Sequence, residues 1–279
     1  MIGRSKSRPG KISLSLLRTN LAPNWEIWWE RRRFILSEHS AGDGLPGVQA
    51  ALLGRVPFEE SWELQQKIWE DRAGGKTGED IFLFLEHDPV FTLGTGGSEA
   101  NVLSRRPPSG EGEIPLVRVN RGGEVTYHGP GQLMMYAICD LRRRERDVHI
   151  HCRRLEEIFV RYLSAMGITA ERRADMPGLW VEGRKILSLG VGARRWVTMH
   201  GVAFNIAPDL RFFDMIHPCG EVGARVTSLE KLIGEAPPLG EVAESLSPVC
   251  RDVFGQEFIW TGEATAPFFP LTPVEGGCS

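Results

Sequence analysis

The sequence lacks several features that would define its class at once. It has no apolar run of the roughly 18 to 20 residues that a membrane-spanning helix needs. Its five cysteines include no Cys-x-x-Cys pair, which argues against a disulfide framework and against a zinc site. The formal net charge of -3, with no basic stripe interleaved with aromatic residues after the N-terminus, argues against a nucleic-acid partner. We therefore expect a chain of a reducing compartment, the cytoplasm, that binds neither membranes nor nucleic acid.

The first 24 residues lack acidic side chains altogether and include five basic ones. That composition resembles an organelle transit peptide, which would make the protein mitochondrial. The alternative is a disordered or mis-started extension of a bacterial protein. We assign residues 1–44 to an N-terminal extension, residues 45–260 to one domain and residues 261–279 to a C-terminal tail. With 279 residues and 42% hydrophobic content, the chain can bury a full core.

Strand patterns outnumber helical patterns along the chain and arrive in clusters. Apolar residues recur at helical spacing over 58–71, over 147–166 with Asp147 as a candidate N-cap, and over 241–254. Strand-like runs cover 80–86, 90–93, 114–139, 179–182, 186–191 and 196–206. This order predicts an α+β fold with a mixed or antiparallel sheet and flanking helices, and it disfavours an alternating doubly wound fold.

The densest unusual segment is residues 121–132, RGGEVTYHGPGQ, in which glycines and a proline surround polar side chains. Glycine lets the backbone come close to a ligand. A hairpin turn at Gly122–Gly123 would place Val125 and Tyr127 on one face of the next strand and Thr126 and His128 on the other. The alternatives are a plain hairpin with one hydrogen-bonded histidine, or the wall of a pocket between two glycine-rich bends.

Cys219 lies in the run Ile216–Gly220, IHPCG, where a proline and a glycine predict a turn around the thiol. A thiol presented in a turn can meet a substrate, although a free cysteine is more often a small buried hydrophobe. The other four cysteines have settings that do not present them: Cys139, Cys152, Cys250 and Cys278.

A nucleophilic thiol needs a cation or a base beside it, and two candidates exist. A hairpin turn at Gly183–Arg184 would deliver Lys185 to the start of a strand, where its charge would favour a nearby thiolate. An isolated lysine is usually just solvated. His200 is the competing candidate, with Asn205 as the group that would orient it in a Cys-His hydrolase.

Six blocks follow one another along the chain at plausible intervals. They are 87–94 (HDPVFTLG), 121–132 (RGGEVTYHGPGQ), 183–186 (GRKI), 200–205 (HGVAFN), 218–220 (PCG) and 227–229 (TSL). This set resembles the lipoyl(octanoyl) transferases, a resemblance that covers roughly residues 45–255. It implies a fold shared with biotin and lipoate protein ligases, and it makes residues 45–260 the catalytic domain.

The resemblance also implies a reaction. An octanoyl group would pass from octanoyl-acyl carrier protein to a specific lysine of lipoyl domains, in 2-oxoacid dehydrogenase complexes and the glycine cleavage H protein. Cys219 matches the nucleophile that accepts the acyl group, and Lys185 matches its cationic partner. No cofactor and no metal are expected, and the chain is expected to be a monomer. The positions that match substrate-binding segments are Arg121, Gly122, Gly123, Glu124, Val125, Thr126, Tyr127, His128, Ser188, Leu189, Gly190, Gly201, Val202 and Ala203.

Three other functions stay open on the sequence. An ATP-dependent lipoate or biotin ligase of the same fold would activate its acid as an adenylate and would not need Cys219. A non-catalytic module would keep the pocket and bind carrier domains without chemistry. A Cys-His hydrolase would pair Cys219 with His200.

Overall fold

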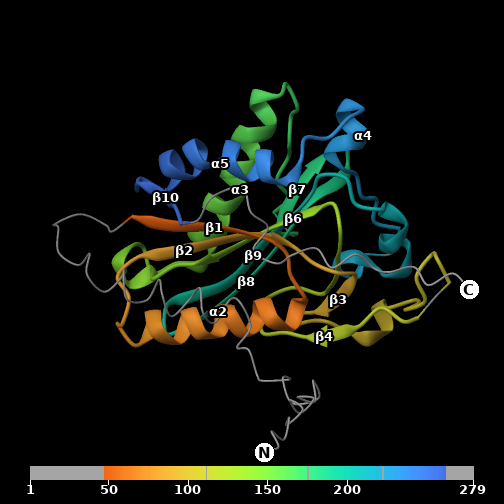
Figure 1. Cartoon of the computed structure of the whole chain (residues 1–279). Helices are drawn as coiled ribbons and strands as arrows, with labels where there is room; N and C mark the ends of the chain where they lie inside the picture. Colours follow the sequence, from red (N-terminus) through yellow and green to blue (C-terminus); the bar gives the residue numbers. More distant parts are fainter. Residues whose placement is uncertain (1–46, 111, 175, 222, 262–279) are drawn as a thin grey trace, which may run out of the picture.

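The structure, a computed structural model, describes residues 47–110, 112–174, 176–221 and 223–261 (Figure 1). The proposed extension 1–44 lies outside these ranges, and so does the tail after Thr261. The hypothesis of a targeting segment therefore stays a prediction from the sequence.

A mixed sheet of seven strands forms the body of the domain. The strand that comes first in the sequence, β1 (Val48–Arg55), runs parallel to both of its neighbours, whereas the remaining pairs are antiparallel. In spatial order the strands are β10 (Phe258–Trp260), β1 (Val48–Arg55), β2 (Asp80–Glu86), β6 (Gln132–Ile138), β9 (Val197–Asn205), β8 (Arg184–Arg194) and β7 (Gly178–Val181). The predicted α+β class with a mixed sheet is confirmed.

Helices cover both faces of this sheet, because its central strands are apolar on both sides. In β2, Phe82 and Phe84 pack toward α3 (Val148–Ala165) and α5 (Leu239–Phe254), while Leu83 and Leu85 pack toward α2 (Phe58–Ala73). Figure 1 shows α3 and α5 on one side and α2 on the other. The alternation of a strand thus builds two hydrophobic cores from one run of residues.

The predicted helices are present with nearly the expected ends. Asp147 caps α3, since its carboxylate accepts hydrogen bonds from the backbone N–H groups of His149 at 2.7 Å and Ile150 at 3.2 Å. A further short helix, α4 (Leu229–Ile233), begins after Ser228. Between β7 and β8, Glu182 and Gly183 both have positive φ, which is the geometry of a two-residue hairpin turn.

A second sheet of three strands lies beside the first, in the order β4 (Leu116–Arg118), β3 (Val90–Leu93) and β5 (Val125–His128). The expected hairpin at Gly122–Gly123 is wrong. The strands before and after it do not pair with each other, because β3 lies between them. Residues 119–124 therefore cross over β3, and this crossing brings the glycine-rich segment to the large sheet, where the Gly122 N–H donates to the Val191 carbonyl at 3.1 Å.

Candidate active site

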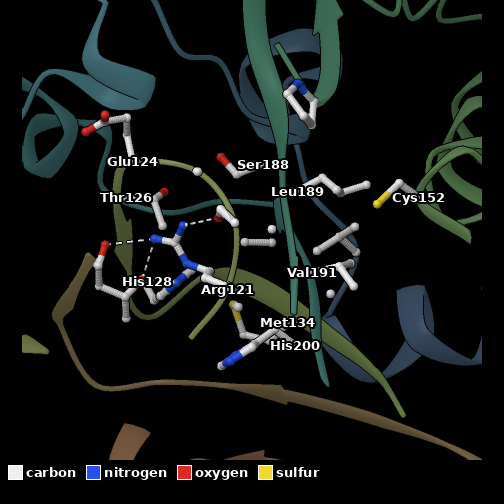
Figure 2. Close-up of a pocket in the computed structure, with 18 of the residues that line it drawn as sticks. Arg121, Glu124, Thr126, His128, Met134, Cys152, Ser188, Leu189, Val191 and His200 are labelled. Carbon is white, nitrogen blue, oxygen red and sulfur yellow. Dashed lines mark hydrogen bonds between the residues drawn. The ribbon is translucent and has the colours of Figure 1, made fainter. Parts of the chain in front are cut away.

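A cavity of about 410 Å³ opens where the small sheet meets β8 and β9 of the large one (Figure 2). Its lining is predominantly apolar, as in most small-molecule sites. It brings together segments that are far apart in the sequence. Of the residues predicted to bind substrate or act in catalysis, those that line it are Arg121, Gly122, Gly123, Glu124, Val125, Thr126, His128, Lys185, Ser188, Leu189, Gly190, Gly201, Val202 and Ala203.

Tyr127 is the predicted binding residue that the structure places elsewhere. It is 1% exposed and does not line the cavity. Its ring stacks on Phe212 with centroids 4.7 Å apart and meets Phe213 and Phe91 edge-on at 5.4 and 5.9 Å. The side chain belongs to the core of the small sheet.

The close approach of two backbones explains why glycine occurs in this wall. A Cβ atom at Gly190 would lie 2.8 Å from Cδ of Arg121 and 3.1 Å from the Gly122 carbonyl oxygen. Carbon atoms do not approach backbone and side-chain atoms this closely without a shift. The glycine of β8 therefore lets the 121–124 crossing lie directly against the strand.

Arg121 joins this crossing to the small sheet. Its side chain is 8% exposed, and Figure 2 shows the guanidinium in the middle of the lining. One terminal nitrogen, Nη2, donates to both the carbonyl and the hydroxyl oxygen of Thr92, each at 2.8 Å, and Nη1 donates to the Gly122 carbonyl at 3.0 Å. Charge-assisted hydrogen bonds of this kind fix the shape of the cavity wall.

His128 lies behind Arg121 and is neutral. Burial lowers its pKa well below the usual value, and the nearby His87 and Arg121 lower it further. Its Nε2 lies 3.1 Å from the Thr92 hydroxyl, and its Nδ1 lies 2.9 Å from Oε1 of Gln132. A neutral imidazole held at both nitrogens serves as a fixed polar connection rather than as a charge.

Lys185, the second residue of β8, also lines the cavity and is 5% exposed. Its Nζ is 4.9 Å from the ring centroid of Trp180, within the range of a cation–π contact. A Cβ atom at Gly178, which has φ of +128°, would come within 2.9 Å of Cε of Lys185. The absence of a side chain at Gly178 thus leaves room beside it for the lysine side chain and for the Leu187 carbonyl.

Residues 225–227, which follow the Cys219 turn in the sequence, are held against the strand carrying Lys185. The backbone of Cys219 lies in a short 3-10 helix, Pro218–Gly220, which confirms the predicted turn. The Lys185 N–H donates to the Arg225 carbonyl at 2.8 Å, and the Thr227 N–H donates to the Lys185 carbonyl at 2.9 Å.

A second pocket of about 160 Å³ adjoins the cavity at Lys185. Pro218 and Glu221, on either side of the thiol turn, line it together with that lysine. The pocket places the turn and the lysine at one site, although the side chain of Cys219 itself is outside the described part of the structure.

The three cysteines whose side chains are described are unsuited to nucleophilic attack. Burial raises the pKa of Cys139 and of Cys250, and it raises the pKa of Cys152 to about 11 with a further contribution from Glu156. A thiol that stays protonated is a poor nucleophile. Cys152 nevertheless lines the cavity, with its sulfur pointing toward Leu189 (Figure 2).

Among the described contacts, Asn205 does not orient His200 as expected of a Cys-His hydrolase. His200 Nε2 lies 2.7 Å from Oδ1 of Asn120, whereas Asn205 hydrogen-bonds Gln132 and Thr227. Burial lowers the pKa of His200 to about 3, and Arg121 adds to this. Its backbone has φ of +62°, an uncommon value for a non-glycine residue that occurs at constrained sites.

Several residues at this site were not predicted to bind substrate or to act in the transfer, although Asn205 was considered as a partner of His200. Phe58, Met134, Cys152 and Met176 line the cavity, and Thr92, Gln132 and Asn205 connect its polar groups. The last three stand within the blocks 87–94, 121–132 and 200–205, but nothing in their spacing predicts that they contact one another.

In the part of the chain that the structure describes, no three His, Cys, Asp or Glu side chains gather as metal ligands would. Over the same residues, no helix combines the length and the apolar character that crossing a bilayer requires.

A family profile defines the class of this catalytic domain. The profile of the lipoyl protein ligase A/B catalytic domain matches residues 57–250. Among solved structures, a lipoate-protein ligase A bound with ATP covers 77% of this chain and 90% of its own, with a TM-score of 0.60 and 17% identity. A bi-partite lipoate protein ligase from Thermoplasma acidophilum covers 79% and 89%, with a TM-score of 0.57 and 18% identity. At these identities the likeness concerns the fold.

Sequence relatives identify the branch of this class. The octanoyltransferase of Geobacter metallireducens is 43% identical over 195 residues, which is 70% of this chain and 88% of that protein. The octanoyltransferase of Methylococcus capsulatus is 42% identical over 205 residues, covering 74% and 93%. The chain therefore belongs to the octanoyltransferases of the lipoyl protein ligase A/B family, and it is an acyltransferase enzyme.

Proposed function

We propose that the enzyme moves an octanoyl group from octanoyl-acyl carrier protein, through a thioester on Cys219, to a specific lysine of lipoyl domains. The observation that carries the proposal is the position of Lys185. This lysine lines both the apolar cavity and the smaller pocket that adjoins the Cys219 turn. An acyl chain in the cavity would thus end beside a cation and a thiol.

The cavity suits a medium-length acyl chain. Its volume of about 410 Å³ falls within the usual range of ligand pockets, about 300–1,000 Å³. Leu189, Val191 and Val202 supply apolar surface, and Met134 adds a flexible side chain. Burying the seven or so carbons beyond the carbonyl, at about 0.8 kcal/mol each, would contribute about 5–6 kcal/mol to binding before entropy losses.

In the first step, the Cys219 thiolate attacks the carbonyl carbon of the donor thioester. The donor sulfur leaves and takes a proton from the Lys185 ammonium, which yields a free carrier thiol, an octanoyl-enzyme and a neutral lysine. One thioester replaces another, so the step is nearly balanced in energy and needs alignment more than driving force. The ordered contacts of Lys185 with Trp180 and with residues 225–227 support such alignment.

In the second step, the amine of the acceptor lysine attacks the acyl-enzyme. Lys185 now accepts the proton that the amine loses, and Cys219 leaves as a thiolate, so both groups return to their starting forms. The product is an amide, which is far less reactive than the thioester. No nucleotide takes part in either step.

The proposed acceptors are lipoyl domains, in 2-oxoacid dehydrogenase complexes and in the glycine cleavage H protein. The structural relative from Thermoplasma acidophilum was studied together with its E2 lipoyl domain, which supports this class of acceptor. We place the reaction in the cytoplasm. The thiols of Cys139, Cys152 and Cys250 are free, as is usual for a reducing compartment.

Intact mass spectrometry of the full chain tests the mechanism. We expect incubation with octanoyl-acyl carrier protein to add one octanoyl group that hydroxylamine removes, and we expect Cys219→Ser to carry no such adduct. Cys152→Ser is the matched control, because it removes the other thiol that lines the cavity. This variant should still be acylated.

The competing functions give different results in the same experiment. No adduct on the wild-type chain, or an adduct lost only in Cys152→Ser, would refute the thioester on Cys219. Modification that requires ATP and free octanoate would identify a ligase of the kind that the ATP-bound structural relative represents. Binding of octanoyl-acyl carrier protein without formation of any adduct would indicate a non-catalytic binding module.

A further inference from the structure

We infer that one directional chain of hydrogen bonds, from Arg121 to the backbone carbonyl of Thr227, aligns the Cys219 segment with Lys185. Gln132 and Asn205 are its positioning residues. The expected effect on the rate of transfer rests on the proposed function. The direction of the hydrogen bonds follows from the contacts alone.

The first half of the chain takes its direction from a cation. The Arg121 guanidinium has only donors, so the Thr92 hydroxyl oxygen accepts from its Nη2 at 2.8 Å. The hydroxyl hydrogen can then point at Nε2 of His128, 3.1 Å away. In this arrangement Nε2 of His128 is bare and the ring hydrogen lies on Nδ1.

The second half takes its direction from a carbonyl, which can only accept. Asn205 Nδ2 must donate to the Thr227 oxygen at 3.0 Å, so its Oδ1 accepts from Nε2 of Gln132 at 2.9 Å. Oε1 of Gln132 then accepts from Nδ1 of His128 at 2.9 Å. Starting from the opposite end, this half also places the ring hydrogen of His128 on Nδ1.

The chain crosses from the small sheet to the large one. Thr92 and His128 lie on neighbouring strands of the small sheet, and Gln132 pairs directly with Asn205 between β6 and β9 of the large sheet. Thr92 and Gln132 are fully buried, and the exposures of His128 and Asn205 are 5% and 4%. Without access to bulk water, each of these groups depends on its neighbour in the chain for its hydrogen bond.

The last member, Thr227, connects the chain to the reacting groups. Its carbonyl accepts from Asn205, and its N–H donates to the Lys185 carbonyl at 2.9 Å. Val226 forms a parallel bridge to Lys185, and the segment leads back to the Cys219 turn. The nucleophile segment is thus held on one side by the lysine strand and on the other by Asn205. A misplacement of about 1 Å between reacting groups can cost about a hundredfold in rate.

Asn205→Asp tests the positioning role, because aspartate has nearly the same shape but cannot donate to the Thr227 carbonyl. Thr198→Val is the matched control. Thr198 lies on the same strand, is fully buried and donates to the Ala137 carbonyl at 2.7 Å, but it is not a member of the hydrogen-bond chain from Arg121 to Thr227. We expect both variants to lower the midpoint of chemical denaturation. Only Asn205→Asp should lower kcat for transfer to a lipoyl domain, by at least about tenfold with KM for the donor unchanged.

A wild-type kcat in Asn205→Asp, or an equal loss of kcat in Thr198→Val, would overturn the positioning role. If Asn205→Asp does not fold, nitrogen-15 NMR of the His128 ring in the wild-type protein decides the direction of the hydrogen-bond chain. We expect the tautomer with hydrogen on Nδ1 at neutral pH, and the Nε2 tautomer or an imidazolium would refute it. This measurement needs no donor, so it is independent of whether the proposed octanoyl transfer is correct.

Discussion

The buried His151 makes folding stability depend on pH, and the size of this effect can be worked from its surroundings. His151 lies on α3 with 1% exposure, its ring 6.0 Å from that of Phe254. Among the described residues neither ring nitrogen has a hydrogen-bond partner. Burial lowers its pKa from 6.5 to about 3, and Arg144 and Arg154 add to this.

The sign follows from which state binds the proton. Between pH about 6.5 and about 3, the unfolded chain protonates this histidine and the folded chain does not, so stability falls as the pH falls through this window. A pH of about 5 lies about 1.5 pH units below the pKa of this histidine in the unfolded chain. At about 1.4 kcal/mol per pH unit, protonation of the unfolded chain lowers the free energy of unfolding there by about 2 kcal/mol relative to neutral pH. Below pH about 3 the contribution of this residue becomes constant.

Replacing His151 with leucine, which has similar volume and no titratable group, removes this contribution. We expect His151→Leu to change the free energy of unfolding at pH 7 by less than about 1.5 kcal/mol. Its loss of stability between pH about 7 and about 5 should be about 2 kcal/mol smaller than in the wild type. Guanidinium denaturation followed by circular dichroism at both pH values measures the difference.

His149→Asn is the control for this experiment, since His149 is an exposed histidine on the same helix. It should show the wild-type pH dependence. His87 and His200, whose pKa values burial lowers to about 4 and about 3, keep part of the acid sensitivity in both variants. An unchanged pH dependence in His151→Leu would show that His151 is protonated in the folded state or is reached by water.

Two further predictions concern the site and the core. Lys185→Ala should fold and should slow alkylation of Cys219 about tenfold at neutral pH, because the thiolate loses its cation. Peptide mapping by mass spectrometry measures the rate, and Lys231→Ala, at an exposed lysine, is the control. An unchanged rate in Lys185→Ala would remove Lys185 from the activating role. Asp80→Asn should lower the free energy of unfolding by about 3 kcal/mol in urea denaturation, because the carboxylate is buried between Arg72 and Arg144 at 3.1 Å from each. Glu99→Gln, in an exposed pair with Arg118, should have no measurable effect, and equal losses in the two variants would contradict the role of burial.

The features that the sequence predicted best are those that depend only on residues close together in the sequence. Asp147 marks the start of α3 because a carboxylate can reach N–H groups two and three residues ahead, and apolar periodicity marks the length of the helix. The hairpin turn before Lys185 likewise needs only local geometry; it was expected at Gly183–Arg184 and lies one residue earlier, at Glu182–Gly183. The resemblance carried by six ordered blocks then identified the octanoyltransferase family, which the relatives confirm.

The errors and omissions concern partners that are distant in the chain. The hairpin at Gly122–Gly123 was wrong because β3 takes the place between the two flanking strands. Tyr127 alternates with Thr126 and His128 as expected, but only the tertiary structure shows that its ring packs on Phe212 and does not line the cavity. Alternation divides a strand into two faces and does not say what covers each of them.

By itself, the sequence determined the α+β class, the main helices and strands, and the candidate pair Cys219 and Lys185. Only the tertiary structure brought the Cys219 turn and Lys185 to one pocket and placed Thr92, Gln132 and Asn205 in one hydrogen-bonded chain. The physical reason is that a buried polar group must find a partner, while the choice of partner depends on strand order and register. Those are set by contacts across the whole fold, which no local pattern of residues contains.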